Sequence, residues 1–129
     1  MMPYGFSKVL AMPFETVTDM VIEALKKEGF GILTQIDVRE KFKEKLGIDF
    51  KKYVILGACN PPYAHQAILS EEDIGLLLPC NVIVYEKDHE TALAIIRPTV
   101  AMQMVKNKSL SKLANEVEKK LEKVFDSIV

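Results

Sequence analysis

The chain has 129 residues, of which 49% are hydrophobic and 27% are charged, and its formal net charge is −1. This length and composition predict one folded domain, residues 1–129, with a hydrophobic core of its own. The charge balance argues against nucleic-acid binding, which requires a basic excess to neutralise phosphates, and the apolar runs are too short to span a membrane.

The N-terminal part of the chain predicts a strand, a helix and a second strand. Gly5 to Met12 alternates weakly and stops before Pro13, as a strand does. A helix follows from Phe14, because apolar residues recur at helical spacing and Gly29 suits a left-handed cap. Phe30 to Val38 alternates again. The apolar face of this helix comprises Val17, Met20, Val21, Ala24 and Leu25.

The middle of the chain predicts short elements separated by Gly and Pro. Arg39 to Leu46 has helical spacing and ends at Gly47, and Tyr53 to Ala58 is an apolar, β-rich run. Pro61-Pro62 breaks that strand and fits the first turn of a short helix, Tyr63 to Leu69. Ser70, followed by three acidic residues, predicts a further helix start with a capping serine.

The C-terminal part predicts a hairpin and a long helix. Asn81 to Glu86 and Thr91 to Arg97 alternate on either side of a polar loop, and Pro98 closes the second strand. The last helix carries a continuous apolar stripe among charged residues. Its members are Leu113, Val117, Leu121, Val124, Phe125 and Ile128.

The resulting order, β-α-β-(short α)-β-(short α)-β-β-α, predicts an α+β fold. Consecutive strands joined by a hairpin indicate a mainly antiparallel sheet, with the helices packed largely on one face. A sheet covered on one side leaves an apolar face bare, and such a face favours dimerisation. We therefore expect a homodimer.

Two Cys-Asn pairs stand at predicted strand ends. Cys59-Asn60 leaves one strand and Cys80-Asn81 enters the next, and ligand groups commonly converge at such ends. The short helix after Cys59 adds polar side chains. The candidate ligand-binding residues are therefore Cys59, Asn60, Tyr63, His65, Cys80 and Asn81.

Several runs of the sequence resemble one known family. Tyr53 to Ala64, with Gly57-Ala58-Cys59-Asn60-Pro61 inside it, is similar to a hallmark of the family catalogued as domain of unknown function 302. Gly75 to Val82, Glu28-Gly29-Phe30 and Arg97-Pro98 also look like that family. The resemblance implies a compact α+β domain in bacteria and archaea. It implies no activity and no catalytic residue.

The cysteines leave several kinds of chemistry open. A helix start beside Cys59 would lower the pKa of its thiol, which makes Cys59 the one candidate nucleophile or redox-sensitive group, with Cys80 as a resolving partner. The alternative is a small buried hydrophobe. Cys59, Cys80 and His65 could supply three metal ligands, but the spacing lacks a CxxC pattern, so we predict no metal or cofactor.

Two further expectations concern Arg97 and the compartment. Folding the hairpin carries Arg97 towards Cys80, where it would either hold an anionic ligand group or stand as an ordinary surface arginine. Two cysteines without an export signal predict reduced thiols and a cytoplasmic protein.

The sequence identifies no reaction and leaves three functions open. We favour a non-catalytic, homodimeric module that binds a small molecule near the Cys-Asn strand ends. The alternatives are a thiol enzyme or redox sensor using Cys59, and a protein-interaction or dimerisation domain.

Overall fold

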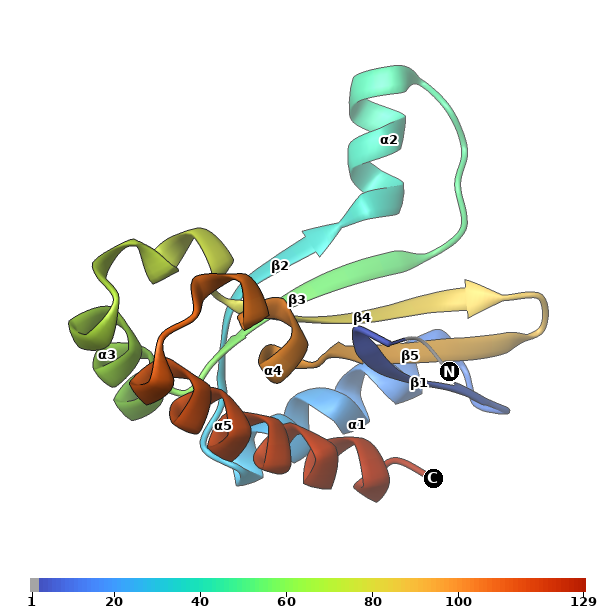
Figure 1. The fold of residues 1–129 in the computed structure, drawn as a ribbon. Helices are drawn as coiled ribbons and strands as arrows, with labels where there is room; N and C mark the ends of the chain where they lie inside the picture. Colours follow the sequence, from blue (N-terminus) through green and yellow to red (C-terminus); the bar gives the residue numbers. More distant parts are fainter. Residues whose placement is uncertain (1–2) are drawn as a thin grey trace.

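The computed structural model describes residues 3–129, which form a five-stranded sheet with two long helices against one of its faces (Figure 1). The chain also contains three shorter helices, α2, α3 and α4, and two short 3₁₀ segments, η1 and η2. The elements are β1 (Gly5–Leu10), α1 (Phe14–Lys27), β2 (Gly31–Asp37), α2 (Val38–Leu46), β3 (Tyr53–Cys59), α3 (Pro61–Ser70), η1 (Glu72–Leu77), β4 (Cys80–Lys87), β5 (Glu90–Ile96), α4 (Pro98–Ala101), η2 (Gln103–Val105) and α5 (Lys108–Ser127).

The sheet is antiparallel throughout, with strand order β1-β5-β4-β3-β2. The β4–β5 hairpin lies at its centre, and Glu86 pairs with Thr91 as its loop predicts. In the pairing of β3 with β4, Ala58 lies opposite Cys80. The end of β3 and the start of β4 therefore meet at one edge of the molecule.

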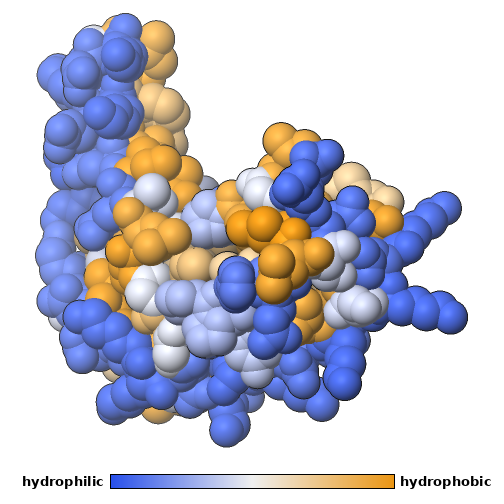
Figure 2. Space-filling view, turned by 90° about the vertical axis from the view of Figure 1, so that its left-hand side faces the viewer, coloured by the Kyte–Doolittle hydropathy of each residue, from blue (hydrophilic) through white to orange (hydrophobic). Residues whose placement is uncertain are grey.

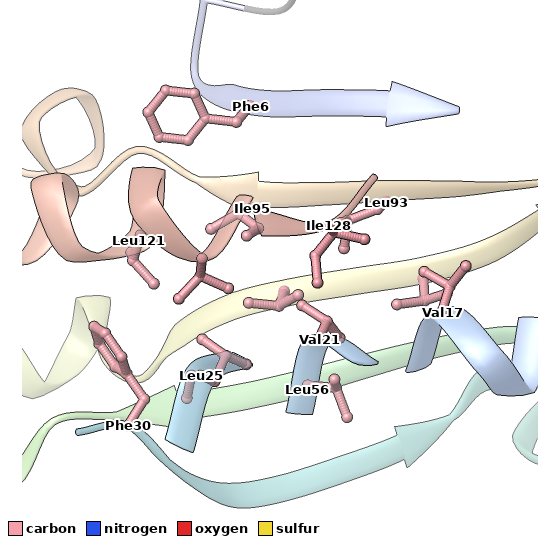
Figure 3. Close-up of a cluster of buried hydrophobic side chains, with 14 of the residues drawn as sticks. Phe6, Val17, Val21, Leu25, Phe30, Leu56, Leu93, Ile95, Leu121 and Ile128 are labelled. Atoms are coloured by element: carbon pink, nitrogen blue, oxygen red, sulfur yellow. The ribbon is translucent and has the colours of Figure 1, made fainter. Parts of the chain in front are cut away.

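The main hydrophobic core lies between the sheet and the two long helices, as Figure 3 shows. Alternate strand residues such as Leu56 and Leu93 point towards α1 and α5, and helical spacing brings Val21 and Leu25 to meet them. Removing this apolar surface from water is the main source of stability. The fully buried side chains include Phe30, Leu25, Leu56, Leu93, Ile95, Leu121, Ile128, Val17, Val21 and Val82.

The α+β fold, the antiparallel sheet and the order of elements confirm the sequence prediction, with two local differences. Ser70 does not cap a new helix. It ends α3, and its hydroxyl group lies 3.4 Å from Asn107 Oδ1 instead. The residues after it form only the 3₁₀ segment η1. The chain after Pro98 also turns through α4 and η2, which the alternation of apolar residues did not predict.

The structure also bears on membrane insertion. In the part of the chain that it describes, no helix combines the length and the apolar character that crossing a bilayer requires.

Candidate ligand-binding cavity

An apolar cavity of about 290 Å³ opens where the ends of β3 and β4 meet α3 and α5. Main-chain segments from five different parts of the sequence contribute to its wall. The lining residues are Phe30, Leu33, Ala58, Cys59, Asn60, Tyr63, Ala64, Ala67, Ile68, Gly75, Leu78, Pro79, Cys80, Pro98, Met102, Leu110, Leu113, Ala114 and Val117. Among residues 3–129, no Asp, Glu, Lys, Arg or His contributes to this wall.

The cavity lies between two separate hydrophobic cores. Phe30 and Ala58 on one side belong to the main core, whereas Ala67 and Leu110 on the other side belong to a smaller cluster with Ile74. The two cores do not merge at this end of the sheet, and the cavity is the space that remains between them.

The end of α1 places Phe30 in the cavity wall. Gly29 adopts φ +87°, which glycine tolerates best, so the N–H of Gly29 donates to Lys26 O and that of Phe30 to Leu25 O. These two bonds form a Schellman cap. The buried Asn60 then joins this cap to the start of α3, because its Nδ2 donates to Glu28 O at 3.2 Å.

Asn107 fixes the far side of the cavity. Its Oδ1 accepts from the backbone N–H of Leu110 at 3.1 Å and so caps α5. Its Nδ2 lies 3.2 Å from both Ser70 O and Glu71 Oε1, at the end of α3. One side chain thus holds together the two helices that border the cavity.

Glu118 fixes the segment that contributes Pro98 and Met102. Its Oε1 accepts from both the N–H and the hydroxyl of Thr99, at 3.0 and 2.6 Å. Its Oε2 lies 3.3 Å from Arg97 Nε. The carboxylate therefore ties the start of α4 to α5.

The structure brings four of the six candidate residues to one place. Cys59, Asn60, Tyr63 and Cys80 line the cavity. His65 and Asn81 are exposed and are not part of the described wall. The ligand-binding role of all six residues stays a prediction.

The two thiols differ from the reactive cysteine that the helix start at Cys59 suggested. Both are free. Burial raises the pKa of Cys59 above its ordinary value. Burial, with a smaller contribution from the negative charge of a Cys59 thiolate, raises the pKa of Cys80 to about 11. The expected lowering of the Cys59 pKa is therefore wrong, because removal of the thiol from water raises it.

We expect both thiols to react slowly with iodoacetamide at pH 7, and Cys80 more slowly than Cys59. The thiolate is the reacting form, and a raised pKa leaves little of it at neutral pH. The alkylation rate of Cys80 should rise about tenfold per pH unit until the pH nears its pKa. Mass spectrometry of peptides from native and urea-denatured protein measures both rates. Rapid alkylation of native Cys59 at pH 7 would revive the thiol-enzyme hypothesis.

The metal and anion alternatives receive no support from the geometry. Within residues 3–129, no three His, Cys, Asp or Glu side chains gather as metal ligands. Arg97 pairs with Glu118 and donates to Pro3 O at 3.3 Å, so its guanidinium group is engaged in the fold.

Much of the cavity wall was missed by sequence reasoning. Ala114 lies within the apolar stripe of α5, and Met102 follows Pro98 in a segment without clear periodicity. One signal was present in the stripe: a small residue, Ala114, stands between Leu110 and Val117, where a larger one would fill the space.

The fold is α+β, with an apolar cavity at one end of its sheet. The family model "Domain of unknown function DUF302" matches residues 6–128, so the chain belongs to this family. A solved structure described as "uncharacterized conserved protein DUF302 from Bacillus stearothermophilus" is 31% identical, with a TM-score of 0.91. The match covers 99% of this chain and 100% of that one. No curated protein is significantly similar to the chain.

Proposed function

We propose that the domain is a non-catalytic, homodimeric module that binds a small, uncharged, apolar molecule in the cavity beside Cys59 and Cys80. One observation carries the ligand class: a cavity of about 290 Å³ has a wall without charged side chains among the described residues. This volume stands near the lower end of the range for small-molecule sites, about 300 Å³.

The chemistry of the wall selects an uncharged ligand. A carboxylate or ammonium group inside the cavity would lose its hydration and find no counter-ion among the lining residues. An apolar guest instead removes the apolar surface of this wall from water, which favours its binding. The Asn60 amide and the Tyr63 hydroxyl are the polar side-chain groups that could orient one end of the guest.

The same wall favours binding over catalysis. The raised pKa values keep both thiols protonated at neutral pH, so neither is activated as a nucleophile. His65, the nearest histidine in sequence, is exposed and does not line the cavity, so no imidazole base faces the thiols there. These features support a site that encloses a molecule without transforming it.

A thermal-shift experiment with matched probes tests the proposal. 1-Octanol and indole are uncharged, whereas octanoate carries a charge on a similar chain. We expect the uncharged probes to raise the Tm by about 4 °C at ten times their Kd, and octanoate to leave it unchanged. If octanoate binds as well as 1-octanol, the uncharged ligand class is wrong.

Two substitutions on α3 locate the binding. Ala64 lines the cavity and is half-buried, whereas Gln66 on the same helix is exposed and lies outside the cavity. Ala64→Leu should weaken probe binding at least tenfold by filling the cavity, and Gln66→Leu should leave it unchanged. Circular dichroism confirms that both variants fold. Equal probe affinities of the two variants would place the probe elsewhere.

A further inference from the structure

One face of the sheet has no long helix over it. Strand alternation points Ile55, Ile83 and Ala94 away from α1 and α5, and paired residues on neighbouring strands share that face. Figure 1 shows α1 and α5 on the other side of the sheet. We call this surface the open face, and it comprises Tyr53, Ile55, Gly57, Ile83, Tyr85, Ala92, Ala94 and Ile96.

The open face carries an aromatic pair that suits an interface. The rings of Tyr53 and Tyr85 stack with centroids 5.1 Å apart, and Lys51 Nζ lies 4.7 Å from the centroid of Tyr85. Tyrosine is enriched among the residues that contribute most to protein–protein binding, because it offers a large rigid surface with a polar end.

Residues 38–52, here called the arm, rise from the sheet between β2 and β3 (Figure 1). The arm has its own internal contacts. Asp37 Oδ1 caps α2 by accepting from Glu40 N at 3.0 Å, and Gly47 ends the helix with φ +67°. The rings of Phe42 and Phe50 then pack edge to face, 5.0 Å apart.

The arm nevertheless lacks a packing partner of sufficient size. None of the nine residues of α2 is buried. Isolated helices shorter than about 12 residues are marginal in water, and most helices in proteins are stabilised by a buried apolar side. Leu46, at 64% exposure, Ile48 and Phe50 instead present apolar surface to solvent.

The arm and the body enclose a hollow above the sheet. Figure 2 shows the arm standing apart, with hydrophobic side chains along the side turned to the hollow and hydrophilic ones on its outer side. One chain thus presents a projecting apolar element beside an apolar sheet face without a long helix over it. Five residues of that face are partly exposed, namely Tyr53, Ile55, Ile83, Tyr85 and Ile96, and the other three are buried.

We infer that a second copy of this chain fills the hollow, with the arm of each copy lying on the open face of the other. This identifies the surface of the homodimer that forms part of the proposed function. A dimer with a two-fold axis requires a self-complementary surface. A projecting arm beside a receiving face is such a surface, because the arm of each copy can lie on the face of the other. A different partner would have to supply both features in matching form.

The charges agree with this occupant. The arm, residues 38–52, carries six basic and three acidic side chains, a net charge of +3, and the rest of the chain carries −4. These opposite net charges favour the approach of a second copy. The acidic residues interleaved along it make it a poor site for nucleic acid or an anionic membrane. The basic residues are Arg39, Lys41, Lys43, Lys45, Lys51 and Lys52, and the acidic ones are Glu40, Glu44 and Asp49.

The size also fits a stable dimer. The fifteen residues of the arm and the five partly exposed residues of the open face supply twenty residues from each copy. Standard protein–protein interfaces use about 20–30 residues a side and bury about 800 Å² on each partner. Neither feature alone reaches that size.

Analytical ultracentrifugation of the full chain and two matched variants tests the inference. Leu46→Glu places a charge on the arm, and Leu76→Glu places one on η1, at a residue that is 89% exposed and belongs to neither surface. We expect wild type and Leu76→Glu to sediment at twice 14.5 kDa, and the Kd of the Leu46→Glu dimer to rise at least tenfold. Hydrogen exchange should show α2 amides protected in wild type and unprotected in Leu46→Glu.

Two outcomes overturn the inference. If the wild-type protein is a monomer at 100 µM, the proposed dimer is wrong. If it is a dimer whose α2 amides exchange freely, the arm is not part of the interface. The cavity test remains separate, because none of the arm residues lines the cavity. Leu46→Glu should still bind 1-octanol, and Ala64→Leu should still dimerise, so each proposal can fail alone.

Discussion

Replacing Gly57 by alanine is expected to lower the free energy of unfolding by about 3 kcal/mol, because the position has no room for a methyl group. A Cβ at Gly57 would overlap the hydroxyl of Thr34 on β2 and lie 2.8 Å from Pro79 Cγ. The threonine can rotate, but the proline ring cannot retreat without moving the segment that enters β4. Urea denaturation, followed by circular dichroism, measures the loss.

Gly31→Ala is the matched control for this substitution. Gly31 also lies in the sheet, but a Cβ there would have no atom within 4 Å. We expect its stability to stay within about 0.5 kcal/mol of wild type. If Gly57→Ala is as stable as Gly31→Ala, Thr34 and Pro79 do not constrain this position. Because Pro79 lines the cavity, Gly57→Ala should weaken probe binding as well.

Replacing Glu118 by alanine is expected to cost about 2 kcal/mol of stability. The carboxylate is only 14% exposed, and its loss leaves the Thr99 amide and the Arg97 guanidinium group without their main partner. Glu116→Ala, at an exposed position on the same helix, should change stability little. Thermal and urea denaturation of both variants measure the difference.

A double-mutant cycle identifies the contact that stabilises the fold. Thr99→Val removes the hydroxyl that lies 2.6 Å from Glu118 Oε1 and keeps the backbone amide. We expect the two substitutions to be non-additive by at least 0.5 kcal/mol, as for residues that share a hydrogen bond. Strict additivity would mean that the hydroxyl and the carboxylate stabilise the fold independently.

The elements of the fold were predictable because their signals are local. The apolar spacing of α1 and the alternation of the β4–β5 hairpin are properties of neighbouring residues. Gly29 and Gly47 marked helix ends, and both adopt positive φ there. Ser70 misled because a serine before acidic residues predicts a cap whether or not another side chain engages its hydroxyl.

The cavity was only partly predictable because its wall joins distant segments. The antiparallel pairing of β3 and β4 accounts for Cys59 and Cys80 lying at one edge. Strand alternation, however, turns Asn81 to the opposite face from Cys80. The contribution of Ala114 depends on how α5 packs across α3, which no local pattern encodes. The pKa of Cys59 likewise depends on burial by residues far along the chain.

The division of the interior into two cores makes the molecule unequal in its local stability. Fifteen buried residues form the larger core, whereas three form the smaller one that holds α3 and η1 against α5. Segments with few buried apolar side chains open at lower free energy than the rest of a protein. Residues 61–77 are thus expected to open at a lower free energy than the sheet. Because α3 borders the cavity, a bound guest should slow amide exchange in α3.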